Sequence, residues 1–167
     1  MKKIRIAING FGRIGRAIAR INAQYGYFDL VLINDINPHI DNLAYLFKYD
    51  STYGKFDGQV SSTDTSIRIN NNLSICTSYS DLDEISWKDF AIDVLIDSSG
   101  VGINVKKLRK LTESKFIYSS IITHSTNDSD FEVIMGVNDD KILAKHRVVS
   151  NSICDANAIA HVMKWID

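Results

Sequence analysis

The feature that most constrains the fold is the run "IRIAINGFGRIGR" at residues 4–16. Its first part, "IRIAI", predicts a buried strand at 4–8. Gly10, Gly12 and Gly15 follow with the G-x-G-x-x-G spacing. One glycine allows a tight turn, one lets the backbone approach a pyrophosphate, and one lets a helix pack on the strand. The run therefore predicts a strand–turn–helix unit whose helix N-terminus can face phosphates.

An acidic residue follows at the spacing that a dinucleotide site requires. A second apolar run, "LVLIN", predicts a strand at 30–34, and Asp35 comes directly after it. Asp35 lies about 20 residues after Gly15, where a carboxylate binds a ribose 2′-hydroxyl and repels a 2′-phosphate. This favours NAD over NADP. The alternative is an ordinary turn with Asp35 capping a loop, but the order of strand, glycines, helix and acid favours the cofactor site.

The helix predicted after the glycines has apolar residues at helical spacing. We expect these residues to face the sheet: Ile14, Ala17, Ile18 and Ile21. Arg16 and Arg20 fall between them and are expected to face away from the sheet.

The rest of the chain alternates short apolar runs with amphipathic stretches, which predicts an α/β fold. We expect a Rossmann-type, doubly wound, mainly parallel sheet with a small antiparallel insert. Further strands are predicted at 93–97, 115–119 and 133–136, and further helices at 104–112 and 155–166. The stretch "IRINNNLSIC" at 67–76 predicts a hairpin, with asparagines in its turn. No linker or repeat interrupts the chain, so we expect one domain over residues 1–167.

Composition excludes several classes of function. The 167 residues carry a net charge of −1, which gives no field for nucleic acid or anionic lipid. No apolar stretch is long enough to span a membrane, and the start of the chain predicts a strand rather than a signal peptide. Cys76 and Cys154 are too few for a disulfide framework, which favours a cytoplasmic location. We predict no metal site.

Cys154 lies in the polar run "SNSICDAN" at 150–157, just before the predicted last helix. A helix N-terminus and a nearby histidine can activate such a thiol as a nucleophile. The alternative is a small buried residue at a strand–helix junction. His161 follows seven residues later, about 10 Å along a helix, which is too far for direct contact. The other histidines are expected in surface loops: His39, His124 and His146.

Several stretches together resemble the glyceraldehyde-3-phosphate dehydrogenase family, specifically its N-terminal NAD-binding half. They are "INGFGRIGR" (8–16), "IND" (33–35), "YDSTYGKF" (49–56), "MGVN" (135–138) and the "SN..C..N" frame (150–157). They occur in the family's order and extend over essentially the whole chain. The resemblance implies a single NAD-binding domain that ends in the helix after the cysteine, without the catalytic and substrate domain. The role of "YDSTYGKF" rests on the resemblance alone.

The resemblance also implies roles for individual residues. The implied cofactor-binding residues are Asn9, Gly10, Phe11, Gly12, Arg13, Ile14, Gly15, Asn34, Asp35, Ser99, Gly100 and Ser119. Cys154 is the implied nucleophile, whose thiolate attacks an aldehyde; hydride then passes to NAD, and phosphate releases an acyl phosphate. The implied partners are a phosphorylated aldehyde, once a second domain is present, and further copies of the chain in a homo-oligomer.

Two residues depart from the family's pattern beside the cysteine. The family has a serine before it and a threonine after it, which help to hold phosphate, whereas this chain has Ile153 and Asp155. Isoleucine offers no hydrogen bond, and Asp155 places a negative charge where an anion should bind. Asp155 is also favourable as an acid in the first turn of a helix. We therefore expect a degenerate phosphate site.

The leading interpretation is the NAD-binding half of a phosphorylating aldehyde dehydrogenase. Erythrose-4-phosphate dehydrogenase, a close relative, shares the same motifs and stays an alternative. A second class is a catalytically incompetent NAD-binding module, and a third is an interaction domain without a ligand. The third is disfavoured because a decayed site has no reason to retain the three glycines together with Asp35.

Overall fold

The computed structural model describes residues 3–166 of the chain. Its strands are β1 (Ile4–Asn9), β2 (Phe28–Asn34), β3 (Tyr49–Asp50), β4 (Gly54–Lys55), β5 (Val60–Ser62), β6 (Ser66–Ile69), β7 (Asn72–Thr77), β8 (Val94–Asp97), β9 (Ser119–Ile122), β10 (Phe131–Glu132) and β11 (Val148–Ser150). Its α-helices are α1 (Arg13–Tyr25), α2 (Ile40–Lys48), α3 (Asn104–Glu113) and α4 (Cys154–Ile166). The ends of the predicted domain, residues 1 and 167, lie outside the described residues.

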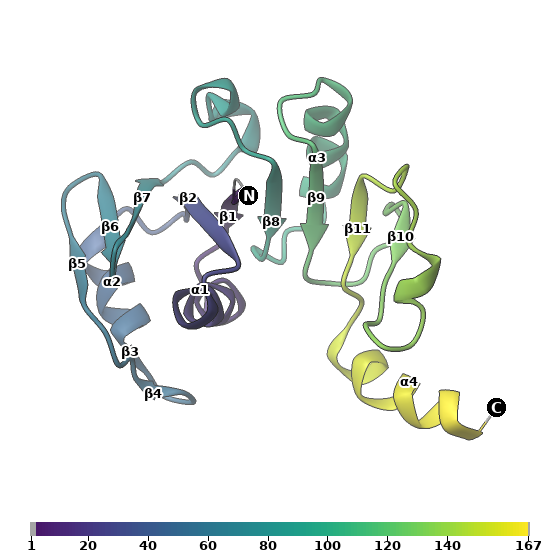
Figure 1. Ribbon diagram of the computed structural model, residues 1–167. Helices are drawn as coiled ribbons and strands as arrows, with labels where there is room; N and C mark the ends of the chain where they lie inside the picture. The colour runs from purple at the N-terminus through teal and green to yellow at the C-terminus, as the bar shows by residue number, and fades with distance from the viewer. Residues whose placement is uncertain (1–2, 167) are drawn as a thin grey trace.

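Nine of these strands form one sheet in the order β10-β11-β9-β8-β1-β2-β7-β6-β5 (Figure 1). The pairs from β10 to β7 are parallel, whereas β5, β6 and β7 pair in antiparallel fashion. β3 and β4 pair only with each other. The predicted Rossmann-type sheet with an antiparallel insert is confirmed.

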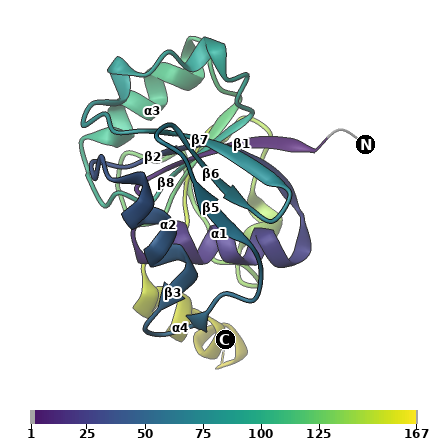
Figure 2. The ribbon, with the colours of Figure 1, turned by 90° about the vertical axis from the view of Figure 1, so that its left-hand side faces the viewer.

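Helices cover both faces of the sheet, with α1 and α2 on one face and α3 on the other (Figure 2). Successive residues of β1 point to opposite faces, as strand geometry requires. Ile8 therefore belongs to the core under α1 and α2, and Ala7 to the core under α3. Both faces of β1 are buried, which explains why its sequence is nearly continuously apolar.

The predicted orientation of α1 is wrong for most of its residues. Ile14 and Ile21 are 53% and 52% exposed, whereas the buried residues of α1 are Gly15, Ala19 and Asn22. α1 lies so close to β1 that its smallest side chains form the contact, and the larger apolar ones are left on the outside. Of the predicted inward residues, only Ile18 packs against the core. Arg16 and Arg20 do not face away, because both bind groups of the protein.

Other sequence predictions divide between confirmed and wrong. The hairpin at 67–76 is confirmed as β6 and β7, with Asn70 at a φ of 52° in its turn. The strand predicted at 115–119 begins only at Ser119, because the chain leaves α3 through Lys115 in a left-handed conformation. Residues 133–136, expected as a strand, form an extended segment and a turn after β10. The elements not expected from the sequence are α2, β3, β4, β5, β10 and β11.

The helix predicted at 155–166 is confirmed as α4, but it buries no residue. It extends outward beyond β11 at the lower right of Figure 1. Lys164 attaches it to the preceding loop by donating to the backbone oxygens of Gly136 and Val137 over 2.9 and 3.0 Å. Among the described residues, no helix is long and apolar enough to cross a membrane.

Candidate functional site

The glycine turn lies at the carboxyl end of β1, and two of its glycines are required by close packing. Gly10 has a φ of 86°, and a Cβ there would lie 2.6 Å from the backbone nitrogen of Ser99. A Cβ on Gly15 would overlap the backbone oxygen of Gly10. Only glycine avoids both problems. By contrast, a Cβ on Gly12 would meet nothing within 4 Å, so the turn is open to a ligand at this position.

The amides next to this opening have no acceptor from the protein. Gly12 is the N-cap residue of α1, and no side chain caps the helix. Within residues 3–166, no protein group accepts a hydrogen bond from the N–H of four residues: Gly12, Arg13, Ile14 and Gly15. Free first-turn amides and the positive end of the helix dipole suit an anionic group such as pyrophosphate. The residues present therefore fit a dinucleotide.

Asp35 lies against the glycine turn. Its Oδ2 accepts a hydrogen bond from the Phe11 N–H over 2.6 Å, and its Oδ1 accepts one from the Asn37 N–H over 2.9 Å. Each carboxylate oxygen has a second lone pair. Asp35 can therefore accept a hydroxyl hydrogen while it holds the turn, a second task that the sequence pattern did not reveal.

Phe11 contributes less to a ligand site than the resemblance implies. Its side chain is buried and stacks on Phe47, with ring centroids 6.1 Å apart. Its N–H is bound by Asp35. Neither its ring nor its amide is available to a cofactor, so Phe11 supports the turn from inside the core.

Asn9 and Asn34 also support the turn rather than face a ligand. The Asn9 Nδ2 donates to Asp97 Oδ1 over 2.8 Å, and the Asn34 Nδ2 donates to Asn9 Oδ1 over 2.7 Å. Thr77 donates to Asn34 Oδ1, and the Ser99 hydroxyl donates to Asp97 Oδ1. The side chains of Asn9, Asn34 and Asp97, which form the middle of this chain of hydrogen bonds, are all buried. This chain of hydrogen bonds joins the carboxyl ends of four neighbouring strands, and the sequence analysis missed Asp97 in it.

Gly100, in the loop after β8, has open space around it. Its φ is 74°, and a Cβ there would meet nothing within 4 Å. The neighbouring Ser99 hydroxyl accepts from Asn104 Nδ2 over 3.1 Å, which ties this loop to the start of α3. Gly100 thus lies on a loop that packs beside the glycine turn.

The structure does not bring Ser119 to this edge. β8 and β9 are parallel, and their register pairs Val94 with Ser119 and Asp97 with Ile122. Ser119 therefore lies at the amino end of β9, opposite to the glycine turn. The implied contact depended on a strand ending at Ser119, whereas the strand begins there. The residues that leave β9 at the carboxyl edge are Thr123 and His124.

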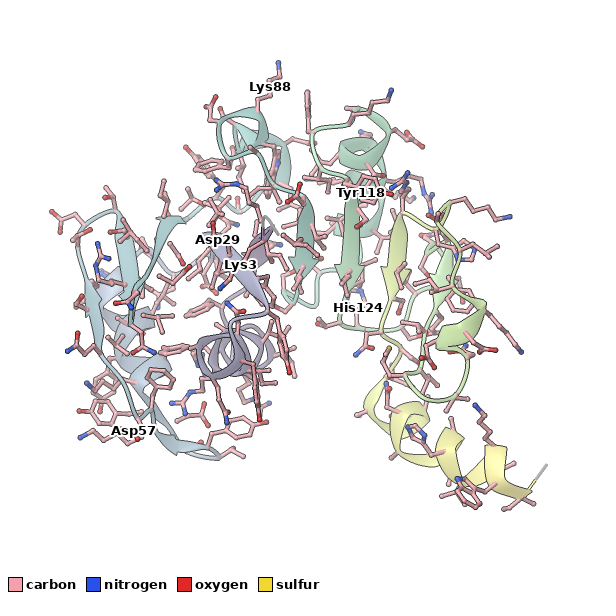
Figure 3. All side chains as sticks on the ribbon, in the orientation of Figure 1. Lys3, Asp29, Asp57, Lys88, Tyr118 and His124 are labelled. Atoms are coloured by element: carbon pink, nitrogen blue, oxygen red, sulfur yellow. The ribbon has the colours of Figure 1, made fainter. Side chains whose placement is uncertain are left out.

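His124 is not the simple surface residue that was expected. Its two ring nitrogens are buried and have no hydrogen-bond partner among the described residues. It follows β9, and Figure 3 shows it at the opposite end of that strand from Tyr118. Its backbone oxygen accepts from the Ser150 hydroxyl over 2.7 Å, which links it to the segment leading to Cys154. His161, in contrast, packs against Gly136.

Cys154 is the first residue of α4 and is exposed. The alternative of a buried cysteine at a strand–helix junction is therefore wrong. Its sulfur lies 3.3 Å from Asp155 Oδ1, to which the thiol donates. Ile153 is also exposed and offers no hydrogen-bonding group. The residues on either side of Cys154 thus provide an apolar side chain and a negative charge.

Cys76 differs from Cys154 in every physical respect. It lies in β7 within the core under α1 and α2. Burial raises the pKa of its thiol to about 11, because a thiolate is poorly solvated there. Cys76 is therefore a protonated core residue at neutral pH.

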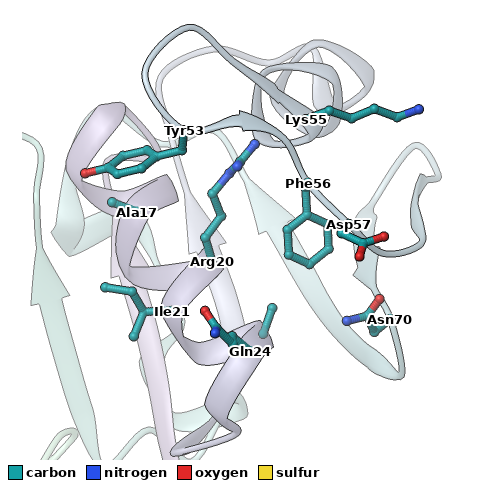
Figure 4. Close-up of a pocket in the computed structure, with 10 residues that line it drawn as sticks. Ala17, Arg20, Ile21, Gln24, Tyr53, Lys55, Phe56, Asp57 and Asn70 are labelled. Atoms are coloured by element: carbon teal, nitrogen blue, oxygen red, sulfur yellow. The ribbon is translucent and has the colours of Figure 1, made fainter.

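A cavity of about 530 Å³ lies elsewhere, between α1 and the segment that follows β4 (Figure 4). Its lining includes Ala17, Ile21, Tyr53 and Phe56, with Arg20 extending toward the chain above it. It contains neither the glycine turn nor Asp35 nor Cys154. This cavity is therefore separate from the candidate cofactor site at the glycine turn.

Comparison with known proteins identifies a matching family. Residues 4–105 match the family described as "Glyceraldehyde 3-phosphate dehydrogenase, NAD binding domain". The matched segment includes the glycine turn, Asp35 and the loop after β8. It ends before Cys154.

Curated relatives match over nearly the whole chain. Glyceraldehyde-3-phosphate dehydrogenase 1 of Candida glabrata is 37% identical over 161 residues, which are 96% of this chain and 48% of the relative. Glyceraldehyde-3-phosphate dehydrogenase of Thermotoga maritima is 35% identical, with 96% of this chain and 48% of the relative covered. Glyceraldehyde-3-phosphate dehydrogenase 1 of Trichormus variabilis is 36% identical, with 100% and 49% covered. The chain spans about half the length of these relatives.

Proposed function

Because the chain belongs to the glyceraldehyde-3-phosphate dehydrogenase family, we propose that residues 1–167 are the NAD-binding half of a phosphorylating aldehyde dehydrogenase. NAD is the cofactor of the matched domain. The observation that carries the proposal is the open first turn of α1, where unbound amides face the space at Gly12 beside Asp35. Open space at Gly12, unbound first-turn amides and an adjacent carboxylate are together typical of a dinucleotide site rather than of an ordinary βα turn.

The residues of the turn divide the work of holding the cofactor. The N–H groups of Gly12, Arg13 and Ile14 donate to the pyrophosphate, and the helix dipole adds to the attraction. Asp35 accepts from a ribose hydroxyl and disfavours a 2′-phosphate. When bound, NAD supplies the acceptor for a hydride. Gly10 and Gly15 keep the turn closed against the loop after β8.

Cys154 is the proposed nucleophile, because it is exposed and begins a helix. Its thiol would add across the aldehyde C=O to give a hemithioacetal. Loss of a hydride to bound NAD and of the hydroxyl proton would leave a thioester, which phosphate would cleave to an acyl phosphate with return of the free thiol. The proposed substrate is a phosphorylated aldehyde. We expect a second domain, corresponding to the other half of the relatives, to help to bind it. Further copies of the chain in a homo-oligomer are part of the same proposal. Erythrose-4-phosphate dehydrogenase, with the same motifs, remains the neighbouring alternative.

A second candidate, a catalytically incompetent NAD-binding module, is favoured by one observation. Asp155 accepts from the Cys154 thiol at 3.3 Å, and a carboxylate there repels an incoming phosphate. This arrangement affects the cysteine alone. It leaves the proposal of NAD binding unchanged.

Calorimetric titration of the chain with NAD, and with NADP as control, tests the proposal. We expect saturable NAD binding and NADP binding at least about tenfold weaker, a difference of ~1.4 kcal/mol. Gly12→Ala is the matched variant, because its methyl group enters open space and leaves the fold intact. It should weaken NAD binding without lowering the melting temperature. Absence of NAD binding by the unaltered chain would overturn the proposal.

A further inference from the structure

Two arginines of α1 reach across to the segment 47–56. The Arg20 Nε donates to the backbone oxygen of Phe47 over 3.0 Å, and its Nη2 donates to that of Gly54 over 3.0 Å. Arg20 thus closes the end of α2 and holds β4 in place. Arg16, four residues earlier on the same helix, has its Nη2 3.8 Å from Asp50 Oδ2. The Arg16 and Asp50 side chains are only 12% and 9% exposed.

Asp50 shapes the turn between β3 and β4. Its Oδ1 accepts from the N–H of Thr52 over 2.8 Å and from that of Tyr53 over 3.0 Å. The N–H groups of Tyr53 and Thr52 lower the pKa of Asp50, and the positive charges of Arg20 and Arg16 add to this effect. Asp50 is therefore a carboxylate at neutral pH, with its other oxygen directed toward Arg16.

Arg16 also reaches the glycine turn. Its Nη1 donates to the backbone oxygen of Phe11 over 3.0 Å. The Phe11 C=O and the Gly12 N–H belong to one planar trans peptide and point in opposite directions. A group that holds the Phe11 oxygen therefore also sets the direction of the Gly12 N–H. That N–H is the first of the unbound amides beside the open space at Gly12.

The peptide before this one is held separately. The Ser98 hydroxyl donates to the backbone oxygen of Gly10 over 2.6 Å, and the Phe11 N–H donates to Asp35 over 2.6 Å. Both ends of the Gly10–Phe11 peptide are thereby bound. Among residues 3–166, the Phe11–Gly12 peptide is bound only at its oxygen, by Arg16, and its N–H is left for a ligand.

We propose that Arg16 and Asp50 are positioning residues for the cofactor: Asp50 holds the Arg16 guanidinium against the Phe11 oxygen and thereby aims the Gly12 N–H at the pyrophosphate. The inference rests on the proposed NAD binding. It assigns a physical role to Asp50 in "YDSTYGKF", a stretch that the sequence analysis explained only by resemblance. It also explains why Arg16 points inward.

Asp50→Asn is the first test, because an asparagine oxygen keeps the acceptor for Thr52 and Tyr53 while the charge that faces Arg16 is lost. We expect NAD binding to weaken about 3- to 10-fold, with an unchanged melting temperature. Asp57→Asn is the control, since it removes an equal charge from an exposed residue directly after the segment 47–56. It should bind NAD like the unaltered chain.

Arg16→Met and Arg16→Lys form a second pair in case Asp50→Asn lowers the melting temperature. The methionine variant should weaken NAD binding about tenfold. The lysine variant should recover part of the loss, because it retains one charged donor for the Phe11 oxygen. Equal losses in both variants would indicate a packing role and overturn the proposal.

The ¹⁵N–¹H resonance of Gly12 gives a readout that general destabilisation does not move. In the NAD-free protein, Asp50→Asn should shift this resonance more than Asp57→Asn does. An unchanged Gly12 resonance together with unchanged NAD affinity would refute the positioning role while the proposed function stands. If the unaltered chain fails to bind NAD, the proposed function fails, and the Gly12 resonance still decides whether Arg16 and Asp50 orient that amide.

Discussion

The Asp35 carboxylate and the Phe11 N–H are joined by a 2.6 Å hydrogen bond, so the acid after β2 and the glycine turn after β1 form one unit. Asp35 contributes both to the geometry of the turn and to the proposed recognition of ribose. A variant that keeps the hydrogen-bond acceptor at residue 35 but removes its negative charge can distinguish the structural role of Asp35 from its role in ribose recognition.

Asp35→Asn should preserve the fold, because an amide oxygen can still accept from the Phe11 N–H. It should reduce the preference for NAD over NADP, because the charge that repels a 2′-phosphate is lost. Asp35→Ala should in addition lower the free energy of unfolding by about 1–3 kcal/mol, since the Phe11 N–H loses its acceptor. Chemical denaturation and calorimetric titration of both variants check this. Equal stability of the alanine and asparagine variants would contradict it.

Gly15→Ala should destabilise the protein, whereas Gly12→Ala should not. A methyl group on Gly15 overlaps the Gly10 oxygen, and relief of that overlap should cost about 1–3 kcal/mol. A methyl group on Gly12 would meet nothing within 4 Å, so its main effect is to reduce the conformational freedom of the unfolded chain. Urea unfolding of the two variants provides the comparison. Similar midpoints would mean that α1 can move away from β1 without loss.

The two cysteines should react in separate phases with a thiol-specific disulfide reagent. Cys154 is exposed and should react first, whereas Cys76 should react only on unfolding, because burial raises its pKa to about 11 and excludes the reagent. Cys154→Ser should remove the fast phase. A fast phase that persists in this variant would show that β7 opens readily.

Asp155→Thr should increase the rate at which iodoacetamide alkylates Cys154 at neutral pH. The Asp155 carboxylate, 3.3 Å from the sulfur, places a negative charge beside the attacking group, and threonine removes that charge. The expected increase is about 2- to 5-fold, the range of an exposed charge interaction. Asp155→Asn removes the charge without a change in side-chain size, and it should also increase the alkylation rate. No change in either variant would mean that the sulfur does not sense this charge.

Asp130 should contribute stability that is lost in acid. Burial raises the pKa of Asp130, but hydrogen bonds from the Val148 N–H, the Arg109 side chain and the Arg147 N–H outweigh it, so the net pKa is lowered. A carboxyl group with a lowered folded pKa stabilises the fold above its ordinary value of about 3.9, and the effect is lost as pH falls below it.

Asp130→Ala should therefore cost about 1–3 kcal/mol at pH 7, because the buried Val148 N–H loses its acceptor. The difference from the unaltered chain should shrink as the pH is lowered below about 4. Urea unfolding at several pH values measures this, with Asp128→Ala as the exposed control. A difference that does not depend on pH would contradict the assigned charge state.

The sequence predicted the features that depend on local chain geometry. The turn at Gly10 to Gly15, the acid at Asp35 and the hairpin of β6 and β7 are all present. Each is specified within a short stretch by glycines, by asparagines or by the end of an apolar strand. The family match adds the identity of the cofactor for this turn.

The features that the sequence analysis missed depend on contacts between distant segments. The inward side of α1 is chosen by how closely Gly15 approaches β1, which hydrophobic periodicity does not measure. Asn9 joins a buried chain of hydrogen bonds because Asp97, far away in sequence, ends the neighbouring strand β8, and Asn34 donates to Asn9 from the other side. Ser119 was misplaced because the left-handed residue Lys115 delays the start of β9. None of these depends on a single short motif.

The strand order sets the distance between the segment that leads to Cys154 and the glycine turn. Three inter-strand steps separate β11, which leads to Cys154, from β1, which leads to the glycine turn. At about 4.8 Å for each step, the two strands lie roughly 14 Å apart along the sheet. A ligand that reaches from the glycine turn to the segment after β11 must therefore cross the ends of β8 and β9, and backbone pairing sets the width of that crossing.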